Sequence, residues 1–415
     1  MRTPRHPMSA DNNDPGFGLG VDQKLTDAVR AAVGAVTDPE LRQPIGDLDM
    51  LREIAVTDGI ADVGIALTIV GCPAASRIES DVRRAAASVP GVLDVHVDVG
   101  VMTPAERAAL TERLRAGRPR GIPFTAESLT RVIAVTSGKG GVGKSTVTAN
   151  LAVALAVRGL RVGLIDADVH GFSIPGLLGL VDAEGRTVRP TRIDDLILPP
   201  VAYGVKTVSI GMFLREGDEG AAVAWRGPML HRTVQQFLTD VHFGDLDILL
   251  LDMPPGTGDI AISVGQLLPH AEVVVVTTPQ AAASDVAIRS ALVARQTGQR
   301  VIGVIENMAA YTLPDGTVLD LFGSGGGAQV AAALSASQAA DASGDVPLLA
   351  SIPLSPALRT AGDAGTPLTA TLNETGDETD AAADDPARRA LIDLAARLAG
   401  VPRGLAGRPL TVTPH

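Results

Sequence analysis

Residues 132–146 read Val132-Ile-Ala-Val-Thr-Ser-Gly-Lys-Gly-Gly-Val-Gly-Lys-Ser-Thr146. The apolar run at the start predicts a buried strand, the glycines predict a loop, and the pattern that follows predicts a helix. The loop matches the phosphate-binding pattern G-x-x-x-x-G-K-[ST] at Gly138, Gly143, Lys144 and Ser145. A flexible glycine turn is the alternative, but the strand before the loop and the helix after it favour the phosphate-binding interpretation.

The residue types of this loop suit phosphate chemistry. Glycines allow backbone N–H groups to close around phosphate oxygens, and the N-terminus of the following helix adds partial positive charge. Lys144 would reach the terminal phosphates as a catalytic residue, and the Ser145 hydroxyl would hold Mg²⁺. We therefore expect ATP and Mg²⁺ as cofactors. The expected nucleotide-binding residues of the loop are Gly138, Gly140, Gly141, Val142, Gly143, Lys144, Ser145 and Thr146.

The composition of the 415-residue chain argues against several classes of protein. A formal net charge of -12 argues against a general nucleic-acid-binding surface. A single cysteine excludes an intrachain disulfide framework and is typical of a reducing compartment. No apolar run reaches the ~20 residues of a membrane span, and the first residues lack the apolar core of a signal peptide. We expect a cytoplasmic protein with no nucleic-acid and no membrane partner.

Residues 21–109 are expected to form a small α+β domain, preceded by a disordered leader over residues 1–20. Asp58-Gly59 is typical of a tight hairpin turn between two strands. The predicted elements are, in order, a helix from Leu25 that stops at Asp38-Pro39, strands over 51–56 and 60–69, a helix over 73–87 and a strand over 95–99.

The only cysteine, Cys72, lies where a predicted strand passes to the N-terminus of a predicted helix. Such a position tends to lower the pKa of a thiol. One interpretation of Cys72 is therefore a metal or cluster ligand. The alternative is a small buried apolar residue, because free cysteine usually packs in that way.

Apolar runs and helical patterns alternate in the second predicted domain, residues 129–368. Most of these runs are continuous, which indicates strands of a parallel sheet that is covered on both faces. We therefore predict a doubly wound, mainly parallel α/β sheet, preceded by the small α+β domain, with ligands at the carboxyl ends of the strands. The predicted strands are residues 132–135, 162–165, 205–210, 248–251, 273–277 and 301–305.

Four further segments complete the predicted organisation. Residues 110–128 include a stretch rich in Gly, Pro and Arg, from Arg115 to Pro123, and are expected to form a linker. Residues 369–386 are acidic and poor in apolar residues, so we expect a disordered excursion. Residues 387–400 place leucines on one helical face and predict a last helix packed on the sheet. Residues 401–415 are expected to form a loose tail.

Carboxylates follow two of the predicted strands. Leu164-Ile-Asp-Ala-Asp168 places two of them after one strand, and Leu249-Leu-Leu-Asp252 places one after another. An aspartate at the end of an apolar strand is a Walker B element, so Asp252 is expected to hold Mg²⁺ through water. Met253-Pro-Pro-Gly-Thr-Gly-Asp259 follows it. Its rigid prolines and mobile glycines suit a loop that changes when the γ-phosphate leaves.

Several of these motifs together resemble one family. A second lysine, Lys139, makes the loop similar to the deviant Walker A sequence G-K-G-G-x-G-K-S-T of MinD/Mrp/ParA-type ATPases. Residues 166–175 and 252–259 resemble the motifs D-x-D-x-x-G-P-S-I-P and D-x-P-P-G-T-G-D of Mrp proteins, with Phe172 in place of a proline. Residues 38–41, 45–48 and 67–73 resemble the small N-terminal domain of many Mrp proteins. The same domain also occurs in iron–sulfur assembly factors. The likeness is closest to the Mrp/ApbC ATPases, regarded as iron–sulfur cluster carriers.

The resemblance implies a P-loop ATPase that works as a homodimer and assigns roles to three side chains. Lys139 would cross to the partner's nucleotide as a catalytic residue, and Asp168 would orient or activate the attacking water. Asn307, in the family-like segment Glu306-Asn-Met308, would bind adenine, since an amide offers both a donor and an acceptor. From the residues alone, the alternatives are a solvated loop charge, a helix N-cap and a strand-end turn, respectively.

The sequence departs from this family where a C-x-x-C would follow Glu306-Asn-Met308. The corresponding segment here, Tyr311-Thr-Leu-Pro-Asp-Gly316, has no cysteine. Iron–sulfur clusters are commonly held by cysteine thiolates, and a dimer of this chain supplies only the two copies of Cys72. Other ligands would have to come from histidine, carboxylate, small thiols such as glutathione, or the client protein.

The expected function is that of an ATP-hydrolysing iron–sulfur cluster carrier, which transfers clusters to apo-protein clients as a nucleotide-gated homodimer. An iron–sulfur cluster is therefore a possible cargo, with Cys72 as its candidate ligand. One alternative is an ATP-dependent client scaffold without its own cluster, which the missing thiolates favour. Another is a positioning ATPase like MinD or ParA, against which the acidic balance argues.

Overall fold

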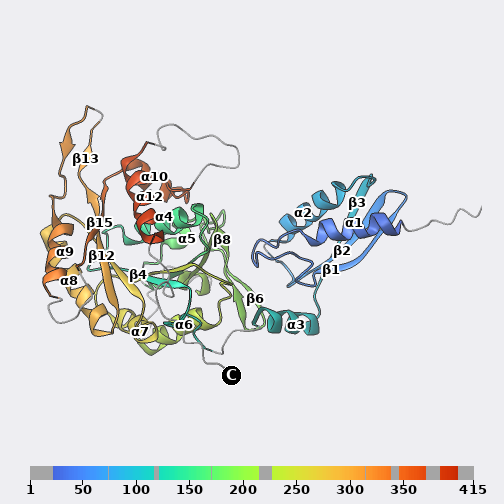
Figure 1. Ribbon diagram of the computed structural model, residues 1–415, viewed down its shortest axis with the longest axis horizontal. Coiled ribbons are helices and arrows are strands. Elements are labelled where there is room, and N and C mark those ends of the chain that lie inside the picture. Colours follow the sequence, from blue (N-terminus) through green and yellow to red (C-terminus); the bar gives the residue numbers. More distant parts are fainter. Residues whose placement is uncertain are drawn as a thin grey trace, which may run out of the picture. The chain divides into compact units, whose positions relative to one another are not determined.

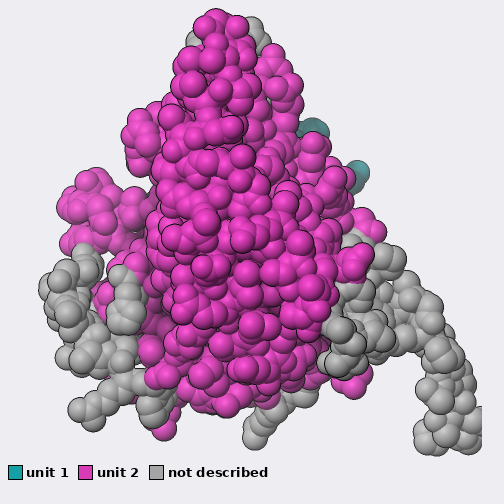
Figure 2. All heavy atoms as spheres, turned by 90° about the vertical axis from the view of Figure 1, so that its left-hand side faces the viewer, with its two compact units in different colours: residues 1–110 teal, residues 111–415 magenta. Residues whose placement is uncertain are grey.

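A computed structural model describes residues 22–72, 74–115, 121–169, 171–214, 227–313, 315–337, 345–370 and 384–400. The chain divides into two compact units, residues 1–110 and residues 111–415 (Figure 2). The expected leader and tail lie outside the described residues, as do residues 116–120 of the expected linker. Within the described ranges, no helix combines the length and apolar character needed to cross a membrane.

The first unit is a small sheet with helices packed on one face (Figure 1). Its strands β1 (Leu51–Thr57) and β2 (Ile60–Leu67) form the expected antiparallel hairpin, and β3 (Asp94–Val101) lies parallel to β2 at the sheet edge. At the turn, Asp58 and Gly59 both adopt positive φ, which is why this dipeptide suits it. Helices α1 (Gln23–Gly34) and α2 (Ala75–Ala87) bury apolar residues at helical spacing. Helix α3 spans Pro104–Arg115.

The second unit is built on a long sheet with the strand order β15-β12-β11-β4-β10-β5-β9-β8. All neighbouring pairs are parallel except β8–β9, which confirms the predicted mainly parallel sheet. The strands are β4 (Arg131–Ser137), β5 (Val162–Asp166), β8 (Val201–Ala202), β9 (Val205–Ser209), β10 (Ile248–Asp252), β11 (Glu272–Thr277), β12 (Arg300–Ala309) and β15 (Leu348–Pro353).

Two hydrophobic cores lie on the two faces of this sheet, as a doubly wound fold requires. One face carries α6 (Gly227–Thr239), α7 (Asp259–Leu267), α8 (Ala281–Gln296) and α9 (Gly326–Ala336). The other face carries α4 (Lys144–Val157), α5 (Ile174–Leu177), α10 (Pro356–Asp363) and α12 (Pro386–Ala399). In Figure 1, α4 and α12 lie above the central strands, and α6 and α7 lie below them.

The second unit also contains two short hairpins outside the long sheet. Strands β6 (Thr191–Ile193) and β7 (Leu196–Leu198) pair with each other, as do β13 (Tyr311–Thr312) and β14 (Val318–Leu319). The β13–β14 hairpin projects from the second unit (Figures 1 and 2). A one-turn 3-10 helix, η1 (Ile210–Phe213), follows β9.

The predicted last helix is confirmed, because α12 buries Leu391, Leu394, Ala395 and Leu398. The expected disordered excursion over residues 369–386 is wrong at both ends. Thr369 is 1% exposed and donates its hydroxyl to the Asn150 carbonyl at 2.7 Å. Asp385 caps α12 through bonds from the N–H groups of Ala387 and Arg388. Residues 371–383 of this segment lie outside the described part of the chain.

Candidate nucleotide site

The glycine loop joins β4 to α4 at the carboxyl edge of the sheet. Gly143 has φ +78°, a left-handed conformation that side chains rarely adopt, and a Cβ there would lie 2.3 Å from Nδ2 of Asn307. A Cβ on Gly138 would lie 2.3 Å from the backbone of α8. No side chain caps α4 at Gly143, so the N–H groups of its first turn remain available to an anion.

A cavity of about 440 Å³ opens above this loop. Its lining includes Asp168 and, from the loop after β10, Pro254 and Pro255. Thus the loop, the segment after β5 and the segment after β10 meet around one space. The loop residues that line it are Lys139, Gly140, Gly141, Val142, Gly143, Lys144, Ser145 and Thr146.

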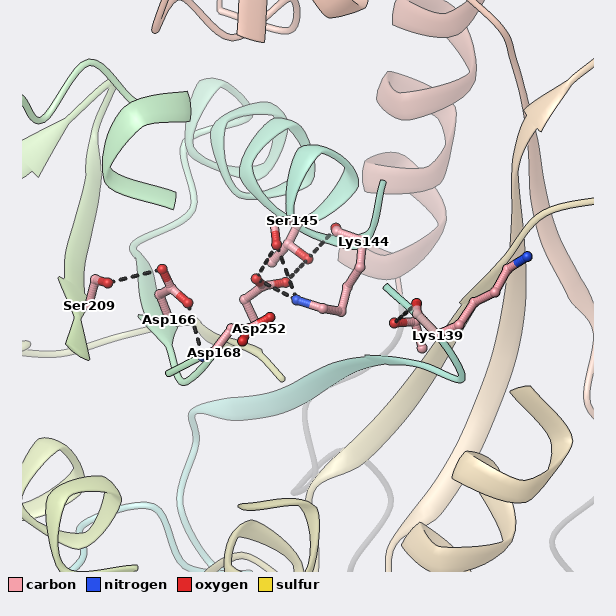
Figure 3. Close-up of polar contacts among 9 residues, drawn as sticks. Lys139, Lys144, Ser145, Asp166, Asp168, Ser209 and Asp252 are labelled. Carbon is pink, nitrogen blue, oxygen red and sulfur yellow. Dashed lines mark hydrogen bonds and ion pairs between the residues drawn. The ribbon is translucent and has the colours of Figure 1, made fainter. Parts of the chain in front are cut away.

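Beneath the cavity, polar groups converge on the fully buried carboxylate of Asp252 (Figure 3). Lys144 places its Nζ atom 2.6 Å from Oδ2, and Ser145 donates its hydroxyl to the same oxygen at 2.5 Å. Thr148, one helical turn after Lys144, donates to Oδ1 at 2.9 Å. Every oxygen of this buried charge therefore has a partner, as burial of a charge requires.

These donors fit Mg²⁺, because a hydroxyl and a carboxylate are hard oxygen ligands. The ammonium of Lys144 already places a positive charge against the Asp252 oxygen that Mg²⁺ would neutralise. Ser145 and Asp252 are thus brought together as the sequence predicted, and they are the residues that would hold the ion.

A second buried carboxylate, Asp166, ends the strand next to Asp252. The register of β5 and β10 pairs Asp166 with Asp252 directly. Burial, and then the charge of Asp252, raise the pKa of Asp166 to about 8. Its oxygens accept the Asp168 N–H at 3.1 Å and the Ser209 hydroxyl at 3.0 Å. Through these two bonds Asp166 supports the loop that carries Asp168.

Lys139 points away from the Lys144–Asp252 cluster (Figure 3). Its Nζ atom donates to Oε1 of Gln280 at 2.9 Å, on the segment between β11 and α8. Lys139 still lines the cavity, so the two loop lysines hold different positions around the same space.

Asn307 is buried beside the loop, and its Nδ2 donates to the Val142 carbonyl at 2.9 Å. It therefore holds the phosphate loop directly in this structure. Its neighbour Glu306 accepts the Gly327 N–H of α9 at 2.8 Å and the Ser351 hydroxyl of β15 at 2.8 Å. The end of β12 thus connects the loop with α9, which follows the β13–β14 hairpin.

Sequence reasoning assigned no role to Thr148, Ser209 or Gln280, and it missed the structural role of Asp166. Thr148 carried a usable signal, because it follows Lys144 by four residues and so shares its helix face. Ser209 and Gln280 reach the site only through the strand order of the sheet, which the sequence does not display.

The expected low pKa of Cys72 is wrong. Its thiol is 7% exposed, and burial, followed by the charge of Glu40, raises its pKa from 9.0 to about 11. The N–H groups of Ala74 and Ala75 lower it, but they do not offset burial. A buried, protonated thiol does not suit a thiolate ligand. In the described part of the chain, no group of three or more His, Cys, Asp or Glu side chains is placed to hold a metal ion.

Comparison with known proteins agrees with this geometry. The family described as NUBPL iron-transfer P-loop NTPase matches residues 128–388, and the iron–sulfur cluster assembly protein family matches residues 26–99. An iron–sulfur cluster carrier protein of Mycobacterium tuberculosis is 51% identical over 396 residues, covering 95% of this chain and 98% of the relative. A carrier of the same name from Bacillus subtilis is 38% identical, covering 79% of this chain and 88% of the relative.

Among solved structures, a nucleotide-binding protein of Archaeoglobus fulgidus in complex with ADP is 33% identical. It has a TM-score of 0.45 and covers 58% of this chain and 91% of that one. The matches to family and relatives extend over both units of the chain. The chain therefore belongs to the iron-transfer P-loop NTPase family that includes the iron–sulfur cluster carrier proteins.

Proposed function

We propose that this protein hydrolyses ATP and carries iron–sulfur clusters to apo-proteins as a nucleotide-gated homodimer. The observation that carries the nucleotide part is the convergence of Lys144, Ser145 and Asp252 under a cavity lined by the glycine loop. The cargo part is supported by the carrier relatives, which match nearly the whole chain.

Each residue of the site has a distinct task in this proposal. The loop N–H groups and Lys144 bind the phosphates, and Ser145 and Asp252 hold Mg²⁺, which supplies positive charge against the phosphate oxygens. Asp168, which lines the cavity, would orient the attacking water or accept its proton. Asn307 binds adenine while its amide N–H keeps the Val142 carbonyl in place.

Control of the dimer by nucleotide would depend on the segments that line the cavity together. Pro254 and Pro255 belong to the loop after Asp252, so loss of the γ-phosphate would be sensed next to the buried carboxylate. Lys139 would leave Gln280 and cross to the nucleotide of the partner subunit, where its charge stabilises the transition state. Dimer contacts would then depend on bound nucleotide.

The cluster is the cargo, and this chain alone does not supply a thiolate set for it. The chain has one cysteine, and that thiol is buried and protonated at neutral pH. We propose that small thiols or client cysteines complete the coordination, and that Cys72 contributes only if its loop opens. The same observation favours one second candidate, an ATP-dependent scaffold that holds apo-clients without a cluster of its own.

The experiment measures two activities of the purified chain. Mg²⁺-dependent ATP hydrolysis is expected, together with ATP-dependent transfer of a cluster, reconstituted anaerobically with glutathione, to an apo-ferredoxin. ATP hydrolysis without any cluster transfer would contradict the carrier function and favour the scaffold function. Absence of nucleotide binding would refute the assignment of the site.

A further inference from the structure

Within the described residues of the first unit, no strand pairs with the outer side of the edge strand β3. Sheet order places β3 last, and its register with β2 runs without a break from Asp94 to Val101. The opposite edge is different, because the Asp22 N–H donates to the Val56 carbonyl and the register of β1 with β2 shifts between Leu51 and Ile54. β3 therefore offers an unbroken edge, whereas β1 does not.

The backbone groups along β3 alternate in direction. Met102 donates its N–H to the Leu67 carbonyl of β2. The backbone N–H and C=O groups of the even-numbered residues therefore point toward β2, and those of the valines between them point away from the sheet. Nearby side chains already bond the outward backbone groups of Val95. Asp94 accepts its N–H at 2.8 Å, and Arg83 donates to its carbonyl at 2.8 Å. Among the described residues, no group forms a hydrogen bond with the outward N–H or C=O of Val97, Val99 or Val101. We call residues 97–101 the open edge.

The two faces beside the open edge have opposite chemistry. One face carries Asp62, Asp94, His96 and Asp98, which are exposed, and we call these four residues the acidic face. On the other face, Val95 is buried under α2, whereas Val99 is 37% and Val101 is 42% exposed. Apolar and acidic side chains thus alternate along one accessible strand.

We propose that the open edge binds an extended segment of a client protein in which basic and apolar residues alternate. The added strand would exchange backbone hydrogen bonds with Val97, Val99 and Val101. Its apolar side chains would cover the exposed valines, and its Lys or Arg side chains would pair with the acidic face. A second copy of β3 fits less well, because it would bring a second set of carboxylates onto the same face.

The inference rests on the proposed function only in naming the client as the source of the strand. The open edge lies in the first unit, and the nucleotide cavity is lined entirely by residues of the second. ATP turnover of the edge variants is therefore measured in parallel. Turnover equal to that of the unmodified chain is expected, so failure of strand binding and failure of the nucleotide site are distinguishable.

The probe is an acetylated and amidated peptide of sequence Lys-Val-Lys-Val-Lys-Val, titrated into the full-length chain. Its matched control is Glu-Val-Glu-Val-Glu-Val. We expect binding of the lysine peptide only, with slowed hydrogen exchange of the Val97 and Val99 amides. Equal binding of both peptides, or binding without protection of these amides, would overturn the proposal.

Two variants separate the backbone and charge contributions. Val99→Pro removes an outward N–H and leaves the inward bonds to β2, a change that edge strands tolerate. It is expected to weaken peptide binding about tenfold, since a hydrogen bond is lost. The double variant Asp94→Asn with Asp98→Asn is expected to weaken binding about fivefold and to reduce its salt dependence.

Asp27→Asn, on the exposed surface of α1, is the charge control and is expected to bind the peptide as the unmodified chain does. Thermal unfolding of each variant establishes that it is folded before binding is measured. Unchanged peptide affinity in both edge variants would refute docking at β3. Loss of chain self-association in Val99→Pro, with peptide affinity unchanged, would identify a second copy as the occupant and overturn the client assignment.

Discussion

The Nζ atom of Lys144 lies 2.6 Å from Oδ2 of Asp252, whose carboxylate is fully buried. The lysine that would bind phosphate thus neutralises the carboxylate that would hold Mg²⁺ in our proposal. An ammonium that donates to Asp252 is less available to a phosphate. We infer that Mg²⁺ and nucleotide would bind cooperatively, because an Asp252 carboxylate that holds the ion would no longer need the ammonium of Lys144, which would then be free to bind phosphate.

Asp252→Asn tests this competition between carboxylate and phosphate. Removal of the negative charge is expected to strengthen ATP binding in EDTA about tenfold, because Lys144 no longer has a charged partner. The same change is expected to abolish Mg²⁺-dependent turnover. Titration calorimetry with and without Mg²⁺ measures both effects, with the exposed Asp245→Asn as the matched control. Weaker ATP binding in EDTA would show that Lys144 and Asp252 do not compete.

Lys144→Ala is expected to weaken ATP binding at least about a hundredfold, because a charged phosphate contact is lost. The variant also leaves the Asp252 carboxylate buried without its cation, which destabilises the fold. The double variant Lys144→Ala with Asp252→Asn removes that penalty and should regain stability but not binding. Lys24→Ala, an exposed lysine of α1, is the control. Full turnover in Lys144→Ala would refute the site.

Lys139→Ala is expected to leave ATP affinity nearly unchanged and to slow hydrolysis at least about tenfold, since the lost charge acts only in the transition state. Gln280→Ala removes the residue that holds Lys139 within the subunit. Its turnover is expected to equal or exceed that of the unmodified chain. Equal losses in both variants would mean that the Lys139–Gln280 bond itself is what hydrolysis requires.

The thiol of Cys72 is expected to react slowly with iodoacetamide. Burial raises its pKa to about 11, so at pH 8 the thiolate fraction is about a hundredfold below that of an ordinary thiol. The unfolded chain in urea is the control and should react at the ordinary rate. Because the folded chain keeps this proton longer, the free energy of unfolding should fall as pH rises from about 9 to about 11. Fast alkylation of the folded chain would contradict the burial of Cys72.

Sequence patterns predicted the parts of the fold that depend on local periodicity. Each of the six predicted apolar runs of the second unit is a strand, because continuous burial leaves a continuous apolar signature. The edge strands β8 and β15 were missed. Val201–Ala202 is too short to give a pattern, and Leu348–Pro353 is only partly buried and ends in proline. Edge strands lack the double-sided burial on which the prediction relied.

The nucleotide loop was predictable because its chemistry is contiguous in sequence. The partners of its residues were less so: Gln280 reaches Lys139, and Asn307 reaches Val142, only through the order of strands in the sheet. For Cys72, the position before a helix predicted a lowered thiol pKa. The tertiary packing that buries the thiol raises this pKa instead. Burial by distant segments is what local sequence does not report.

The most direct test of the carrier account is the iron and sulfide bound per dimer after anaerobic reconstitution with glutathione. It is measured with and without Mg-ATP, in the unmodified chain and in Cys72→Ser. We expect a cluster that elutes with the protein, is released by ATP turnover, and is retained at the same level in Cys72→Ser. Normal ATP turnover with no bound iron or sulfide would contradict cluster carriage.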